Sequence, residues 1–251
     1  RPDGRVLAEQ EVAVHQAVDH VHGGAVRPVV AGEPGQVAEA VVVVHGGRVA
    51  VDPNLPCGTC PSCRKGLTNL CRDLKAYGVT HNGGFAEYSI LRADHLHAIG
   101  SMPYHIAALA EPLACVVNGL DSAGLRGGAS MPEDALVIGA GPIGLLLALS
   151  LKAEGAKNVM VADVNESRLA FAAELGLGGI VSGSADLAAR RRACDFVADA
   201  TGIASVAEGM IDLLADGGTA LFFGVCAPDA RIAVSPFEIF RRQLKLVGSH
   251  S

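Results

Sequence analysis

The chain has 251 residues, half of them hydrophobic, and a formal net charge of −6 at pH 7. This length allows two domains and a sizeable core. The acidic balance, without a basic stripe, argues against a nucleic-acid partner, and no apolar run is long enough to span a membrane. Because no hydrophobic leader is evident either, we expect a cytoplasmic protein without a membrane partner.

The first informative element is a cysteine cluster with the spacing C-x2-C-x2-C-x7-C. Its members are Cys57, Cys60, Cys63 and Cys71. Four thiolates can surround one Zn²⁺ tetrahedrally and leave no position for a substrate, so such a metal would be structural. Two disulfides or four unrelated thiols are the alternative readings. The short C-x2-C steps favour zinc.

The second half of the chain begins with the pattern strand, glycine turn, helix, strand. A short apolar strand at Ala135–Ile138 leads into Gly139–Gly144, which matches G-x-G-x-x-G. We expect a helix through Leu145–Ala153 and a second strand at Asn158–Ala162, ending in Asp163. This order is typical of a dinucleotide-binding domain.

Each residue of this fingerprint has a physical reason. Gly139 allows a tight turn, Gly141 lets the backbone approach a pyrophosphate, and Gly144 lets the helix pack on the strand. The pyrophosphate would then lie at the positive end of the helix. The candidate cofactor contacts in this turn are Gly139, Gly141, Pro142, Ile143 and Gly144.

Asp163 lies where a carboxylate accepts hydrogen bonds from the adenosine ribose. A carboxylate there repels a 2′-phosphate, so the sequence predicts NAD rather than NADP. Two alternatives stay open at this point. Asp163 could instead cap a helix at Glu166–Leu175, or the domain could have lost its cofactor.

The alternation continues to the C-terminus. We expect strands at Asp195–Gly202, Thr219–Gly224 and Gln243–Gly248, with a helix at Ala204–Leu214 that is stopped by Asp216–Gly218. Such alternation predicts a doubly wound parallel sheet that binds ligands at the carboxyl ends of its strands. The candidate contacts there are Thr201, Gly202, Gly224, Val225 and Ser249.

The cysteine loop upstream of this fingerprint resembles the zinc-containing medium-chain alcohol and polyol dehydrogenases. Other segments share the resemblance: Gly47–Pro53, Gly83–Tyr88, Ala110–Cys115 and Ser235–Arg242. It is strongest to the sorbitol, threonine and butanediol dehydrogenase branch. It implies an α/β protein with a GroES-like β-barrel domain at 1–118, containing a zinc lobe at 55–72, and a Rossmann domain at 119–251. It also implies a homodimer or homotetramer.

In that family a second zinc polarises the substrate alcohol while hydride leaves for the nicotinamide. The resemblance places Glu111 in that metal site, and Glu33 is a weaker match. The chain departs from the family in this region. It has no cysteine before Arg48, and Gln16 occupies the ligand-cysteine position. The histidine expected beside Glu33 is missing.

Three explanations compete for this departure. The chain could hold the metal through substitutes, it could be catalytically degenerate, or this segment could be abnormal. The candidate substitute ligands are His15, His20, His22, Glu33 and Glu111. The usual C-terminal return to the first domain is also not found, so we expect a truncated form.

These observations predict an NAD-dependent, zinc-containing dehydrogenase acting on a secondary alcohol or polyol. The rival is a non-catalytic NAD-binding protein with one structural zinc. A zinc-independent reductase fits less well, since such relatives usually lack the cysteine loop. We expect the last strand, Gln243–Val247, to pair across a subunit boundary, since it would otherwise be an exposed edge.

Overall fold

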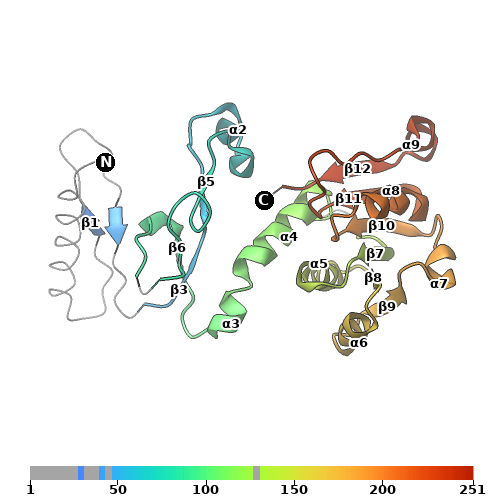
Figure 1. The fold of residues 1–251 in the computed structure, drawn as a ribbon, viewed down its shortest axis with the longest axis horizontal. Helices are drawn as coiled ribbons and strands as arrows, with labels where there is room; N and C mark the ends of the chain where they lie inside the picture. Colours follow the sequence, from blue (N-terminus) through green and yellow to red (C-terminus); the bar gives the residue numbers. More distant parts are fainter. Residues whose placement is uncertain (1–27, 31–39, 43–46, 87, 127–130, 251) are drawn as a thin grey trace. The chain divides into compact units, whose positions relative to one another are not determined.

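The computed structural model describes residues 28–30, 40–42, 47–86, 88–126 and 131–250. Their contacts divide the chain into two units, Arg1–Glu111 and Pro112–Ser251 (Figure 1). The division falls within helix α4 (Ala110–Ser122). The boundary expected after residue 118 lies in the same helix and stays a prediction.

The described strands of the first unit form three antiparallel pairs. They are β1 (Pro28–Val30) with β2 (Ala40–Val42), β3 (Val49–Val51) with β6 (Leu96–Ala98), and β4 (Asn54–Leu55) with β5 (Lys75–Ala76). Between and after them lie α2 (Pro61–Arg64), two 3-10 helices (Thr68–Leu70 and Ala93–His95) and α3 (Tyr104–Ala107). Buried His95 braces the β3–β6 pair, because its carbonyl accepts from the Asp52 amide at 2.9 Å.

The second unit is a six-stranded parallel sheet in the order β12-β11-β10-β7-β8-β9. Its strands are β7 (Asp134–Ile138), β8 (Asn158–Asp163), β9 (Gly178–Val181), β10 (Cys194–Asp199), β11 (Leu214–Phe222) and β12 (Lys245–Gly248). Its remaining helices are α5 (Pro142–Ala153), α6 (Glu166–Glu174), α7 (Ala185–Ala188), α8 (Ala204–Leu213) and α9 (Pro236–Arg242). This is the predicted Rossmann architecture, with the strand order reversing between β10 and β7.

The period-two alternation of the strands explains why this sheet has helices on both faces. On β7, Ala135 and Val137 pack with α4, α5 and α6, whereas Leu136 and Ile138 pack with α8. Figure 1 shows α5 and α6 on one side of the sheet and α8 on the other. Every residue of β7 after Asp134 is buried, as expected for a central parallel strand.

One predicted helix stop is wrong. The triplet Asp216–Gly218 does not end α8, which already ends at Leu213, but lies inside β11. The register with β10 shifts there, and Gly217 has a φ of +81°. The glycines therefore form a bulge in a strand that starts earlier than predicted.

Strand β9 was not predicted. Its sequence begins with two glycines, which are poor strand formers. A Cβ at Gly178 would lie 3.1 Å from the Met160 side chain, and one at Gly179 would lie 3.3 Å from that of Leu169. Packing against residues that are distant in sequence thus explains the two glycines, and the local sequence gives no sign of it. In the part of the chain that the structure describes, no helix is long and apolar enough to cross a membrane.

The closest backbone approach in the glycine fingerprint gives the first prediction. A Cβ at Gly144 would lie 1.8 Å from the Gly139 carbonyl oxygen. We expect Gly144→Ala to lower the free energy of unfolding by about 1–3 kcal/mol, because the strand and the helix must separate. The measurement is the urea midpoint at constant m-value.

Gly141→Ala is the matched control. Gly141 has a φ of −75°, and an added Cβ there meets no atom within 4 Å. Its stability should stay close to that of the unmodified chain. Equal losses in the two variants would show that the Gly144–Gly139 contact is not the cause.

Candidate functional site

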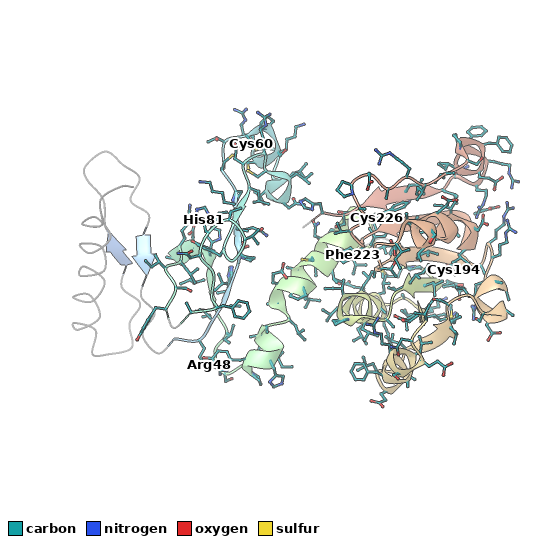
Figure 2. The ribbon with its side chains drawn as sticks, in the orientation of Figure 1. Arg48, Cys60, His81, Cys194, Phe223 and Cys226 are labelled. Carbon is teal, nitrogen blue, oxygen red and sulfur yellow. The ribbon has the colours of Figure 1, made fainter. Side chains whose placement is uncertain are left out.

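The four clustered cysteines converge on one point in the first unit. All their sulfur atoms lie within 4.8 Å of one another. Cys60 caps the N-terminus of α2, where its sulfur accepts the Cys63 amide at 3.5 Å (Figure 2). The Cys57 amide points to the Cys71 sulfur at 3.2 Å. A donor set of four cysteine sulfurs this close together fits one tetrahedral Zn²⁺.

The pKa values of these thiols show why the cluster suits a cation. The backbone amide of Cys63, followed by that of Arg72, lowers the pKa of Cys60 to about 6. Burial, followed by the neighbouring Cys60, raises the pKa of Cys63 to about 12. Without a cation, negative charge on one sulfur opposes charge on the next. A divalent ion reverses this and deprotonates the thiols that bind it.

The donors for a catalytic metal are not assembled in the same way. Glu111 lies in the first turn of α4 and is exposed. Among the described residues, the cysteine cluster is the one group with metal-binding geometry, and Glu111 is not a member. Glu33, Gln16 and the histidines at 15, 20 and 22 lie outside the described residues. Among the described residues, Glu111 therefore lacks the further donors that a catalytic zinc needs.

The predicted dinucleotide contacts gather at the carboxyl edge of the second unit's sheet. Gly139 follows β7 and turns the chain with a φ of +107° into α5, which begins at Pro142. Its amide donates to the Ala162 carbonyl at 2.7 Å, so the turn is joined to β8. The N-terminus of α5 is therefore presented beside the end of β8, as a pyrophosphate site requires.

Asp163 ends β8 and is only 6% exposed. Its carboxylate accepts the Ala140 amide at 2.8 Å and the Asn165 amide at 2.9 Å. Burial raises the pKa of Asp163, but these two amides and the nearby Arg168 guanidinium together hold it below its usual value. The carboxylate therefore stays charged beside the glycine loop. The helix-cap alternative is wrong, because Asn165 caps α6 through the amides of Ser167 and Arg168.

The remaining candidates follow β10 and β11. Thr201 and Gly202 form the turn after β10, and Gly224 and Val225 follow β11. The two turns are in close contact, since a Cβ at Gly224 would lie 2.2 Å from the Gly202 nitrogen. Ser249 follows β12, where its hydroxyl accepts from the Asn118 amide group at 3.0 Å.

Two residues at this edge were not singled out from the sequence. Arg168, in the first turn of α6, lies 3.5 Å from the Asp163 carboxylate. Asp199, at the end of β10, bonds to Thr201. A signal existed for both: a basic residue shortly after the strand-ending acid, and a second acid directly before the Ala-Thr-Gly turn.

Comparisons with known proteins identify the same two domains. Residues 142–251 match the family model for zinc-binding dehydrogenases, and residues 12–101 match the alcohol dehydrogenase GroES-like domain. The whole chain is 66% identical to D-altritol 5-dehydrogenase of Agrobacterium fabrum and covers 78% of its length. The chain belongs to the zinc-binding dehydrogenase family. It is therefore an oxidoreductase with a GroES-like domain and a Rossmann domain.

Three further similar proteins are less alike in sequence. The chain is 35% identical to D-arabinitol dehydrogenase 1 of Uromyces fabae, over 81% of its own length and 60% of that protein's. Among solved structures, a zinc-binding dehydrogenase from Sinorhizobium meliloti 1021 bound to NADP aligns over 88% of this chain and 70% of that one. The TM-score is 0.76 at 28% identity. An alcohol dehydrogenase from Escherichia coli CFT073 complexed with NADH has a TM-score of 0.74 at 27% identity, over 90% and 66% of the two chains.

The cysteine cluster yields the second prediction. We expect one zinc per chain at this cluster, lost in Cys60→Ser, because three thiolates and a hydroxyl are a weaker donor set. Elemental analysis of protein purified without chelator measures it. Cys226→Ser, a change outside the cluster, is the control and should keep that zinc. If Cys60→Ser kept it too, the cluster would not be the zinc site.

Proposed function

We propose that this chain is an NAD-dependent dehydrogenase that transfers hydride between a secondary alcohol of a polyol and NAD. The observation that carries the proposal is the buried, charged Asp163 carboxylate, bonded to Ala140 within the glycine loop. That arrangement fits an adenosine ribose at the end of β8 and its pyrophosphate at the start of α5. When bound, NAD supplies the hydride acceptor, and the chain's own residues bind and orient it.

The proposed residues follow from their places at the sheet edge. The pyrophosphate contacts are Gly139, Gly141, Pro142, Ile143 and Gly144, and the nicotinamide side is bounded by Thr201, Gly202, Gly224 and Val225. The role of Gly141 as a pyrophosphate contact is supported by open space beside it, since no atom lies within 4 Å of a Cβ placed there.

We infer NAD rather than NADP from the charge of Asp163, although the S. meliloti protein is bound to NADP. Asp163 carries a negative charge at the ribose position, and a 2′-phosphate would be repelled by it. Arg168 partly offsets that repulsion but is more than half exposed, so solvent screens it. The balance favours NAD.

The polyol substrate is supported by the relatives. D-altritol 5-dehydrogenase and D-arabinitol dehydrogenase 1 are named for acyclic polyols.

For the metal sites, we propose a structural zinc on the four clustered cysteines, with Glu111 and Glu33 as members of a catalytic zinc site. The domains proposed are 1–118 and 119–251. A cytoplasmic location remains a prediction.

A second function is favoured by one observation. Glu111 does not belong to a group with metal-binding geometry among the described residues. A non-catalytic NAD-binding protein with one structural zinc would have the same arrangement around Glu111. The two functions separate on whether a second zinc binds and whether NADH forms when polyols are added.

The third prediction tests the proposed function. We expect NADH to form from NAD and D-altritol or D-arabinitol. In Asp163→Asn the preference for NAD over NADP, as a ratio of kcat/KM, should fall roughly tenfold or more, since a charge-assisted hydrogen bond and a repulsion are both lost. Because the pKa of Asp163 is lowered, protonation of its carboxyl group should weaken the NAD preference only at a pH below the usual pKa of an aspartate.

Asp212→Asn is the control, since Asp212 is an exposed carboxylate on α8 that pairs with Arg191. It should leave the NAD preference unchanged. Binding of NADH without turnover of any polyol would favour the non-catalytic function. An unchanged preference in Asp163→Asn would remove the role given to its charge.

Strand β12 supports a homo-oligomer. It is the edge of the described sheet, and Leu246 on it is 38% exposed. On the preceding helix, Phe237 and Phe240 are 63% and 79% exposed. An edge strand can pair with another copy, and exposed aromatic residues favour such association. We expect a dimer or tetramer by light scattering, weakened by Leu246→Lys; a monomer at micromolar concentration would contradict this.

A further inference from the structure

Asp199 is a buried carboxylate at the carboxyl end of β10, and only 1% of it is exposed. One carboxylate oxygen, Oδ1, accepts the Thr201 amide at 2.8 Å and the Thr201 hydroxyl at 2.6 Å. The other, Oδ2, is buried and has no hydrogen-bond partner among the residues that the structure describes. Asp199 thus binds Thr201 through one carboxylate oxygen, while the other oxygen has no partner in the described part of the chain.

Through Thr201, this carboxylate reaches the glycine loop and α8. The Thr201 hydroxyl accepts the Ile203 amide at 3.1 Å, at the start of α8. The Thr201 methyl group lies over Gly139, since a Cβ on that glycine would be 3.0 Å from it. The conformation of Thr201 therefore affects the first turn of the fingerprint.

The backbone of Asp199 contacts the loop that follows β11. Its carbonyl accepts the amides of Phe223 and Gly224 at 3.1 and 2.7 Å. Figure 2 marks Phe223 and Cys226 in the segment that follows β11. With the close Gly202–Gly224 contact, Asp199 joins three loops: those after β7, β10 and β11.

The free energy of folding does not explain why a carboxylate is present here. Burying a charge with an unpartnered oxygen is costly, and a neutral group of the same shape costs less. Such a residue points to a requirement in another state of the protein.

The sheet topology identifies that state. β10 pairs with β7 at the point where the strand order reverses, and a dinucleotide crosses a doubly wound sheet there. Asp163 marks the adenosine half of the cofactor on β8. Asp199 therefore lies on the side of the nicotinamide half.

We propose that Asp199 is a positioning residue, which holds the Thr201–Gly202 turn in the conformation that receives the nicotinamide half of the dinucleotide. The inference rests on the proposed function, since it requires a dinucleotide at this edge. It adds a residue whose effect is confined to one half of the cofactor.

The experiment compares Asp199→Asn with Asp195→Asn. Asp195 is on the same strand and also binds two backbone amides, those of Glu133 and Asp134, but at the opposite end of the sheet. Affinities are measured for NADH and for 5′-AMP, which fills only the adenosine half, together with the thermal unfolding midpoint.

In Asp199→Asn, we expect the Kd for NADH to rise roughly tenfold, as when a charge-assisted hydrogen bond becomes a neutral one. The Kd for 5′-AMP should stay within about twofold, and the unfolding midpoint should be unchanged or higher, because a buried charge is removed. Asp195→Asn should lower the midpoint and leave the ratio of the two affinities unchanged.

Thr201→Val provides a second variant, which keeps the shape of the side chain and removes its hydroxyl. It should also weaken NADH more than 5′-AMP, and it serves if Asp199→Asn does not fold. Equal weakening of both ligands with a lower midpoint, or no change in either affinity, overturns the positioning role. An unmodified chain that bound neither ligand would overturn the proposed function as well.

Discussion

The second unit depends on how closely its backbone segments can approach at the carboxyl edge of the sheet. Gly144 lies against the Gly139 carbonyl, and Gly224 lies against Gly202. A side chain at Gly144 would push α5 away from the turn after β7, and one at Gly224 would separate the turns after β10 and β11. The same approach creates the surface that meets a ligand, because it aligns the start of α5 with the ends of β8, β10 and β11. Packing and binding thus rest on one set of glycines.

The opposite edge of the sheet is stabilised differently. There Arg242, only 3% exposed, donates to the Leu214 carbonyl and bonds Asp216 at 3.0 Å, which ties α9 to the bulge of β11. Arg192 joins the same network through Glu238 at 2.8 Å. Its charges are paired within the protein, whereas Asp199 at the carboxyl edge keeps one oxygen without a partner among the described residues. The edge with Arg242 therefore stabilises the fold, whereas the carboxyl edge is where a ligand would bind.

Sequence patterns predicted what depends on local spacing. The glycine fingerprint, the acid after β8 and the cysteine steps each encode one turn and one set of neighbours, so the Rossmann sheet and the sulfur cluster follow from them. Strand β9 and the bulge of β11 were missed, because glycines there serve contacts with Met160, Leu169 and β10, distant in sequence. The role of Asp199 could not be read either, since a buried oxygen without a partner is a property of three dimensions.

The zinc lobe shows why a metal can be required where no chemistry takes place. Neither α2 nor the 3-10 helix at Thr68–Leu70 contains a buried residue, and Cys71 is the buried side chain in this loop. A segment with so little apolar burial cannot offset the entropy of ordering its backbone. The sulfurs supply the missing contacts only when a cation removes their mutual repulsion. The lobe's order is therefore linked to metal binding, and the dinucleotide edge, built on glycine packing and a hydrophobic core of its own, is not.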